Sequence, residues 1–422
     1  MLKIITFGVF LALMFYNASV ALENKYEVNG DAYDYLHLGL SLAKSGKFGH
    51  FKISRDELIE DFKENNIEHK EYEFRSQTAF RPPVWPLIIA GIFLVFGYSL
   101  TILVIFKFLL HVTGVYIFYK TLRLLKIREL MILIGTLFYA ISPAWQLYSR
   151  FFLSEPLTLF LITLWVYLLI KHLKTGLTWW HQAFITGVIV LCHPYFLFLP
   201  FSIYLILYIN SQISLRIFFL SSAVCAAIIS SWVIRNSIVL NTDKVVLTTS
   251  SGAVMAKGWN SKVVNEHTNT KGDLADETLV LKDYSFGENR PSNEVDRMNL
   301  YKDATINFIS SNPKMIVPII GRKIRSAFNP FPETSRPGIL ETGRVIFQFL
   351  ALIALLYIII ISRDNLMNSL ALGLVLSTIV ITIFTYSGFR FRMPQSGLEI
   401  MFMVFSLDRL LAKLVVRSHS YQ

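Results

Sequence analysis

Long apolar stretches recur along most of the chain, and short polar segments separate them. A helix needs about 20 consecutive apolar residues to cross the hydrocarbon core of a bilayer. The pattern therefore predicts an all-α polytopic membrane protein with about ten transmembrane helices, forming a single domain over residues 1–422. The expected crossings are residues 4–22, 100–119, 130–147, 156–170, 183–193, 195–209, 217–234, 343–361, 366–386 and 397–412.

The first apolar run, residues 4–22, has a second interpretation as a secretory signal peptide. Ser19-Val20-Ala21 offers small residues at the position of a cleavage site. The run is also long enough to span, so we expect it to be retained. In either case the polar residues that follow Leu22 emerge outside the cytosol.

Two polar segments, residues 23–81 and 235–340, are too long for turns and too polar to lie in lipid. Helical spacing of apolar residues predicts short helices within them, and the prolines at 82–83 predict a shallow helix that ends at Gly97. The expected elements are helices at 31–44, 55–62 and 82–96, a β-like stretch at 245–249, an irregular stretch at 260–293 and a helical stretch at 294–328. We expect the last stretch to break at Asn312-Pro313 and its basic end to lie along the lipid headgroups.

The distribution of basic residues gives the orientation of the crossings. Short cytosolic loops of membrane proteins collect lysine and arginine. The densest basic loop follows the crossing at 100–119 and contains Lys120, Arg123, Lys126 and Arg128. We therefore expect this loop and both termini in the cytosol, and the two long polar segments outside it. The expected location is the cell membrane, with the active site on the extracytosolic face.

Composition supports the membrane assignment. The chain is 54% hydrophobic and only 16% charged, with a mean hydropathy of +0.50, whereas soluble proteins carry about 25% charged residues. This excludes a soluble globular enzyme and a disordered chain. The net charge of +11 follows from basic cytosolic loops, so we expect no nucleic-acid partner. The sequence contains no CxxC, HExxH, P-loop or GxGxxG motif, and both cysteines lie in apolar stretches.

Charged residues near the outer ends of the crossings are the candidate site. Ionisable groups close to the hydrocarbon are costly, and pairing or function usually explains them. A carboxylate can deprotonate a hydroxyl, and arginine can bind a phosphate through two parallel hydrogen bonds. The candidates are Asp31, Asp34, Arg81, Arg150, Glu155, His193, Arg235, Arg390 and Arg392.

Simpler roles remain open for several of these residues. Asp34 could serve only to cap the helix at 31–44, and Arg150 could be an outer anchor. His193, which precedes a proline, could be satisfied by the backbone at a helix end. Any of the arginines could extend to the lipid headgroups.

Five segments resemble C-type glycosyltransferases of family 39, the superfamily of protein mannosyltransferases and aminoarabinose lipid A transferases. The sequence Asn29-Gly-Asp-Ala-Tyr-Asp-Tyr-Leu36, with the Gly-containing stretch after it, is similar to the family's first outer loop. His193-Pro194 departs from the Arg-Pro of many members, and residues 52–75 are longer and more charged than expected. The other matching segments are Phe80–Leu87, Leu153–Leu157, Ser231–Asn236 and Gly388–Pro394.

The resemblance implies an inverting transfer of a sugar from a polyprenyl-phosphate donor to a lipid, glycan or protein acceptor. Asp31 would be the general base, and Glu155 would position the acceptor or share a divalent cation, Mg or Mn, with Asp31 or Asp34. If the loop that contains Arg390 and Arg392 is extended, both guanidiniums could reach one phosphate. The expected substrate-binding residues are Asp34, Arg81, His193, Arg235, Arg390 and Arg392.

Two other classes of function remain open. A transporter or flippase of a lipid-linked sugar would often show paired internal repeats and broken helices at the midplane. The sequence shows no repeat, and its candidate residues gather at one face. A polysaccharide polymerase would share the location and differ in its substrate, an oligosaccharide on a diphosphate carrier.

Overall fold

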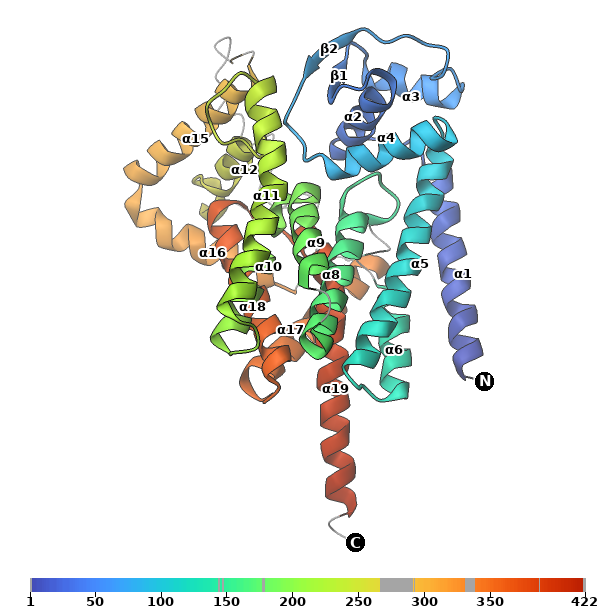
Figure 1. Ribbon diagram of the computed structural model, residues 1–422, viewed down its shortest axis with the longest axis vertical. Helices are drawn as coiled ribbons and strands as arrows, with labels where there is room; N and C mark the ends of the chain where they lie inside the picture. The colour runs from blue at the N-terminus through green and yellow to red at the C-terminus, as the bar shows by residue number, and fades with distance from the viewer. Residues whose placement is uncertain are drawn as a thin grey trace.

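A computed structural model describes residues 2–142, 145, 148–176, 179–265, 291, 293–330, 338–386 and 388–419. Long helices run roughly parallel to one another and form the body of the molecule (Figure 1). In the described part of the chain, five helices are long and apolar enough to cross a membrane. They are α5 (Leu100–Leu124), α8 (Glu155–Thr175), α11 (Leu215–Val239), α17 (Ile339–Ile360) and α18 (Asn365–Phe384).

The remaining expected crossings also lie in helices, but several of these helices are short. The helices α6 and α10 have 12 residues each, and α9 has 14, which is fewer than the roughly 20 needed for a full crossing. Helix α6 covers the first part of the expected crossing at 130–147 and ends at Ala140. The elements concerned are α1 (Leu2–Glu23), α6 (Glu129–Ala140), α9 (Trp179–Cys192), α10 (Phe198–Ile209) and α19 (Ser396–His419).

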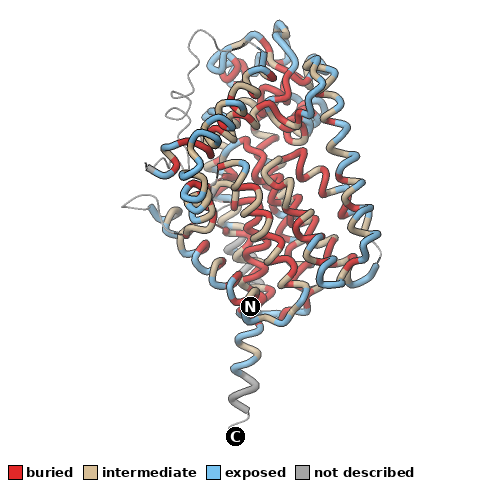
Figure 2. The backbone as a smooth tube through the Cα atoms, turned by 90° about the vertical axis from the view of Figure 1, so that its left-hand side faces the viewer, coloured by how far each residue is buried: buried red, intermediate tan, exposed pale blue. Residues whose placement is uncertain are grey.

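The two ends of the helical body differ. The helix α1 begins and α19 ends at the lower end (Figure 1), and a view from the side places both there as well (Figure 2). The upper end has a cap of short elements from the first polar segment. Buried residues concentrate along the centre of the body, between the helices (Figure 2). The cap consists of α2 (Asp31–Ser45), α3 (Arg55–Lys63), α4 (Val84–Phe96), β1 (Gly49–Phe51) and β2 (Phe74–Gln77).

Local signals account for the helices of the cap, which confirm the predictions at 31–44, 55–62 and 82–96. The carboxylates of Asp31 and Asp34 lie in the first turn of α2, where they interact favourably with the helix dipole. The helix ends at Gly46, which has a φ of 68° and so suits a left-handed C-cap. Ser54 and Glu57 form a capping box at the start of α3.

The described part of the chain is mostly helical, as expected, and the cap adds one small antiparallel sheet of two strands, β1 and β2, that the sequence analysis did not predict. The strands have three and four residues, too few for an alternating pattern to show in the sequence. The pairing also needs close backbone contact: a Cβ atom on Gly49 would lie 2.2 Å from the Ser76 carbonyl oxygen. Glycine is therefore required where the strands meet.

The second polar segment forms helices, as predicted for its last part. The helix α15 (Glu294–Ser311) is followed by a break at Asn312-Pro313, the short helix η3 (Pro313–Met315) and α16 (Ile316–Phe328). The basic end of α16 is partly turned inward, because Lys323 is buried and donates to the Ile383 carbonyl over 3.0 Å. The first part contains α12 (Ser251–Gly258) and α13 (Lys262–Asn265).

The β-like stretch expected at 245–249 does not form a strand. The backbone carbonyls there accept hydrogen bonds from side chains of α11 instead: Asn236 Nδ2 donates to Val246, and Trp232 Nε1 donates to Leu247 over 3.0 Å. Side-chain donors thus replace the partner strand. Most of the stretch predicted as irregular, 266–290 and 292, lies outside the described residues.

Candidate active site

Five of the charged candidates form one ion-pair network at the upper end of the body. Arg81 donates to Asp31 and to Asp34, with its Nη2 2.7 Å from the Asp34 carboxylate. Arg390 donates from Nη2 to Asp31 over 2.8 Å and from Nε to Glu155. Asp31 therefore joins the two arginines, and Arg390 connects α2 to α8. The structure brings these sequence-predicted residues together.

Each member of the network comes from the end of an element. Asp31 and Asp34 lie in the first turn of α2, Glu155 is the first residue of α8, and Arg81 lies between β2 and α4. Arg390 belongs to η4 (Phe389–Gln395), the short helix that connects α18 to α19. Helix ends that meet at one place concentrate ionisable groups there, because side chains in the middle of a span would face lipid or core.

The network holds Asp31 in its ionised form. Burial alone would raise the pKa of Asp31, but the positive charges of Arg81 and Arg390 outweigh that effect and lower it well below its usual range. Burial alone would lower the pKa of Arg81, but the negative charges of Asp31 and Asp34 outweigh that effect and raise it above its ordinary value. In total, three carboxylates share two guanidiniums. The network is therefore one positive charge short of neutrality.

Glu155 has an unused hydrogen-bonding atom. The residue has no exposed surface, and its Oε1 accepts from Arg390. Its Oε2 is buried and has no hydrogen-bond partner among the described residues. A buried carboxylate oxygen without a partner is costly, so such atoms in native structures call for an explanation. A hydroxyl donor of a substrate would satisfy it.

His193 lies beside the network. It follows α9 and precedes η1 (Pro194–Phe196), and it is close enough to Glu155 and Arg390 to interact with their charges. The ring packs edge-on against Phe196 and Phe391, with centroids 5.4 and 6.0 Å away. Its Nδ1 is buried and has no partner within the described ranges, so the ring is not satisfied there by the backbone.

Arg392 lies outside the network, and the extended loop on which Arg390 and Arg392 could both reach one phosphate does not form. Residues 389–395 form a 3₁₀ helix, in which side chains two positions apart point in different directions. Arg392 instead donates to Glu399 of α19 over 2.7 and 3.0 Å, and both side chains are buried. This pair ties η4 to the start of α19.

Arg235 is also separate from the network. Its guanidinium donates to the carbonyl oxygens of Thr78 and Phe48 over 2.7 and 3.0 Å, and to the amide oxygens of Gln77 and Asn236. These contacts hold the sheet of the cap against α11. Arg235 thus lies near the C-terminal end of α2, whereas Asp31 and Asp34 lie at its start.

Three residues that sequence reasoning missed support the segment that leads into Glu155. Lys107 of α5 is buried, and its Nζ donates to the carbonyls of Ser149 and Phe151 over 2.6 and 2.8 Å. Trp85 Nε1 donates to the Phe152 carbonyl over 2.9 Å. The Tyr35 hydroxyl accepts from Ser154 over 3.3 Å, and Arg81 lies over the Tyr35 ring. A lysine within an apolar run was a usable signal for the first of these.

The divalent cation expected at the acidic residues has no preformed site in the described part of the chain. No group of three or more His, Cys, Asp or Glu side chains there is placed to hold a metal ion. Asp31, Asp34 and Glu155 each bind an arginine instead.

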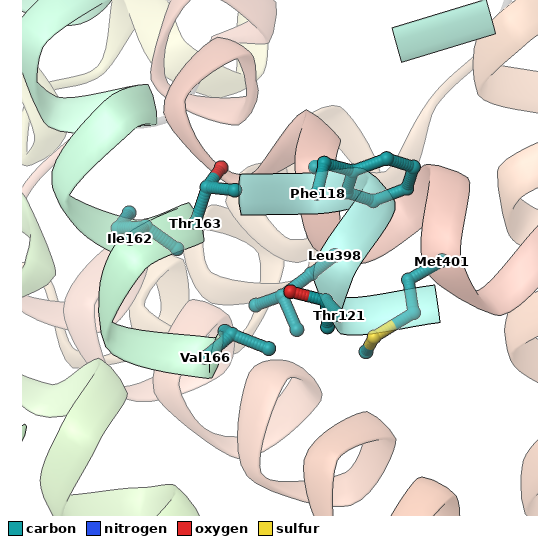
Figure 3. Close-up of a pocket in the computed structure, with 8 residues that line it drawn as sticks. Phe118, Thr121, Ile162, Thr163, Val166, Leu398 and Met401 are labelled. Carbon is teal, nitrogen blue, oxygen red and sulfur yellow. The ribbon is translucent and has the colours of Figure 1, made fainter. Parts of the chain in front are cut away.

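A small cavity deeper in the body does not compete as a binding site. It lies between α5, α8 and α19 and is lined mainly by apolar side chains such as Phe118, Ile162 and Met401 (Figure 3). Its volume of about 10 Å³ is that of roughly one water-sized sphere. The hydroxyls of Thr121 and Thr163 donate to their own helices. A substrate does not fit there.

Comparisons with protein-family models, with curated proteins and with solved structures gave no match. The functional argument therefore depends on the site itself.

Proposed function

We propose that the chain is a multi-pass glycosyltransferase of the cell membrane. It would move a sugar from a polyprenyl-phosphate donor to an extracytosolic lipid, glycan or protein acceptor, with inversion at the anomeric carbon. The observation that carries the proposal is the network in which Arg390 joins Asp31 of α2 to the fully buried Glu155 of α8. It places carboxylates and guanidiniums together where helix ends meet.

In this proposal, Asp31 and the two arginines act together. The acceptor hydroxyl oxygen forms a bond to the anomeric carbon, the bond from that carbon to the phosphate oxygen breaks, and Asp31 receives the hydroxyl proton. Arg81 and Arg390 hold the pKa of Asp31 low while they bind it, which makes it a weak base. When the departing phosphate attracts these guanidiniums, the pKa of Asp31 rises. Asp31 thereby becomes a stronger base as negative charge develops on the departing phosphate.

Glu155 and His193 suit acceptor binding in the same scheme. The unpartnered Oε2 of Glu155 can accept a hydrogen bond from an acceptor hydroxyl, and the Nδ1 of His193 has no partner among the described residues. Both groups are in a region of low dielectric constant, where a correctly oriented hydrogen bond is strong. Asp34 keeps Arg81 oriented by accepting from its Nε over 3.0 Å.

The proposal includes ten crossings with both termini in the cytosol. The basic residues of the loop after α5 lie at the end of the body opposite the cap, and α1 begins and α19 ends there too (Figure 1). The short helices α6, α9 and α10 would cross by being packed within the protein. The network would then face the extracytosolic side.

Mass analysis of cell-surface glycolipids and glycoproteins, in cells with and without the protein, tests the proposal. The loss of a single sugar from one class of surface molecule is expected, together with its restoration by the wild-type gene but not by Asp31→Asn. A lipid-linked sugar that accumulates unchanged in the inner leaflet would instead identify a flippase. Asp56→Asn, an exposed change at the start of α3, is the matched control.

A further inference from the structure

A polar pocket lies at the C-terminal end of α2, whereas the ion-pair network lies at the start of that helix. It has a volume of about 260 Å³, and its walls include Lys47, Phe48, Gln77, Leu87, Trp232 and Arg235. At 1.5 Å per residue, the helix α2 separates Asp31 from Gly46, which also lines the pocket, by about 22 Å. The pocket is therefore a different site from the network.

The walls of the pocket contain two basic residues and no carboxylate. Lys47 Nζ lies 5.1 Å from the Phe74 ring centroid and makes no hydrogen bond or ion pair within the described residues. Among the described residues, Arg235 donates to neutral carbonyl and amide oxygens, and the charge of Glu294 acts on it from outside the pocket walls. The nearby Glu294 already accepts from Thr78 and Ala79. None of the residues that line the pocket is acidic.

Aromatic and apolar side chains form the rest of the pocket. Phe48 and Trp232 meet edge to face with ring centroids 5.0 Å apart, and the Arg235 guanidinium lies 4.7 Å from the Trp232 centroid. Leu87 of α4 is 52% exposed. Two turns further along the same helix, Leu94 and Val95 are 67% and 72% exposed. A charged pocket thus adjoins an uncovered apolar surface.

The position of α11 places this pocket at the level of the lipid headgroups. The helix has 25 residues and so a length of about 37 Å, against about 30 Å for the hydrocarbon core. Arg235 lies near its upper end, and the neighbouring Ile234 and Ile238 are 58% and 74% exposed. A long helix with exposed apolar residues around an arginine near its end fits the boundary between lipid and water.

We propose that this pocket binds the phosphate headgroup of an anionic phospholipid in the outer leaflet, with an acyl chain along the exposed side of α4. Lys47 contributes an ammonium that has no ion-pair partner among the described residues, and Arg235 adds a second positive charge in a wall that contains no carboxylate. The phospholipid would hold the β1–β2 sheet against α11. This inference does not depend on the proposed sugar transfer.

Direct binding measurements on the purified full-length protein test the site. Native mass spectrometry would measure the apparent dissociation constants of phosphatidylglycerol and phosphatidylcholine at matched chain length. Phosphatidylglycerol should bind more tightly, and Lys47→Gln should weaken it by about fivefold, as expected for one basic residue near an anionic headgroup. Lys47→Arg should retain most of the affinity, because the charge is kept.

Lys52→Gln is the matched control, since Lys52 is exposed, lies five residues further along the chain and already binds Glu73. It should leave phosphatidylglycerol binding unchanged. Equal affinity for the two lipids, or equal affinity in Lys47→Gln and wild type, would overturn the proposal. Displacement of the lipid by millimolar inorganic phosphate would show that a free anion is the ligand, and would overturn the lipid assignment. Sugar transfer is not a readout, so its absence would not affect the outcome.

Discussion

Arg390 Nη2 donates a hydrogen bond to an Asp31 carboxylate oxygen over 2.8 Å, across 359 positions of the sequence. The same guanidinium donates from Nε to Glu155. Arg390 therefore fixes the distance between the proposed base on α2 and the buried acid on α8. A lysine in its place would keep the charge but lose the planar guanidinium, whose Nε and Nη2 donate in fixed directions to the two carboxylates.

Asp31→Asn should reduce transfer by roughly 10²–10⁴-fold, the usual contribution of a general base. Folding should be retained, because Arg81 keeps Asp34 and Arg390 keeps Glu155 as partners. Assays of sugar transfer with purified protein, alongside thermal unfolding, would measure both effects. Near-normal turnover in Asp31→Asn would remove the residue from this role, and Asp56→Asn should behave like wild type.

Arg390→Lys should lower both transfer and thermal stability. The substitution keeps the charge but weakens the pairing of a fully buried carboxylate, so it should cost part of the roughly 3–5 kcal/mol that is lost when a buried ion pair is broken. Adding Glu155→Gln removes the charge of that poorly paired carboxylate, so the double variant should regain stability but not transfer. If the double variant recovered both, Arg390 would act only as the structural partner of Glu155.

Arg392→Lys should differ from Arg390→Lys. Arg392 binds Glu399 away from the network, so its loss should lower the melting temperature more than it lowers turnover per folded molecule. Activity normalised to the folded fraction separates the two variants. An equal loss of normalised activity in both would show that the Arg392–Glu399 pair also controls the site.

Lys107→Met should destabilise the protein. It leaves the buried Ser149 carbonyl and the partly buried Phe151 carbonyl without their donor, at about 1–3 kcal/mol for a buried unsatisfied group. Lys120→Met changes an exposed residue of the same helix and should have little effect. A melting temperature for Lys107→Met equal to that of wild type would mean that water replaces the ammonium.

His37 should make the cap less stable in acid. Burial, and then the charge of the neighbouring His50, lower the pKa of His37 to about 3, and its Nε2 accepts from the Phe51 backbone N–H over 3.0 Å. The unfolded chain binds a proton below about pH 6.5 and the folded chain does not. The contribution of neutral His37 to the free energy of unfolding is therefore fully present above about pH 6.5. It is lost as the pH falls toward 3, with a slope approaching about 1.4 kcal/mol per pH unit.

The comparison of wild type with His37→Gln between pH 7 and pH 4.5 measures this slope. The melting temperature of wild type should fall more steeply over that range, although some slope remains in the variant because burial also lowers the pKa of His50. His69→Gln, at an exposed position of the same segment, should follow wild type. Parallel curves for wild type and His37→Gln would contradict the assignment.

Cysteine labelling checks the orientation. Cys192 and Cys225 are both buried, so the wild-type protein should react little with an impermeant thiol reagent. A cysteine at the exposed Glu64 of the cap should react in intact cells, and one at the exposed Glu129 or Arg363 should not. The opposite pattern would place the ion-pair network in the cytosol and exclude an extracytosolic active site.

Local features of the sequence predict the helices and much of the site composition. Apolar run length and helical spacing are local properties, so they predicted the positions of the long helices, of α2 and α3, and the break at Asn312-Pro313. The energetic cost of charge near lipid singled out Asp31, Arg81, Glu155 and Arg390 before their contacts were known.

Which of these charged residues pair with one another depends on the tertiary packing. Arg390 and Arg392 are two residues apart and chemically identical, yet the 3₁₀ geometry of η4 directs one to Asp31 and Glu155 and the other to Glu399. Arg235 looked equivalent to them in sequence, but the packing of α11 against the cap gives it backbone carbonyls as partners. The pairing of β1 with β2 was likewise hidden, because a contact between distant segments leaves no periodic signal in either one.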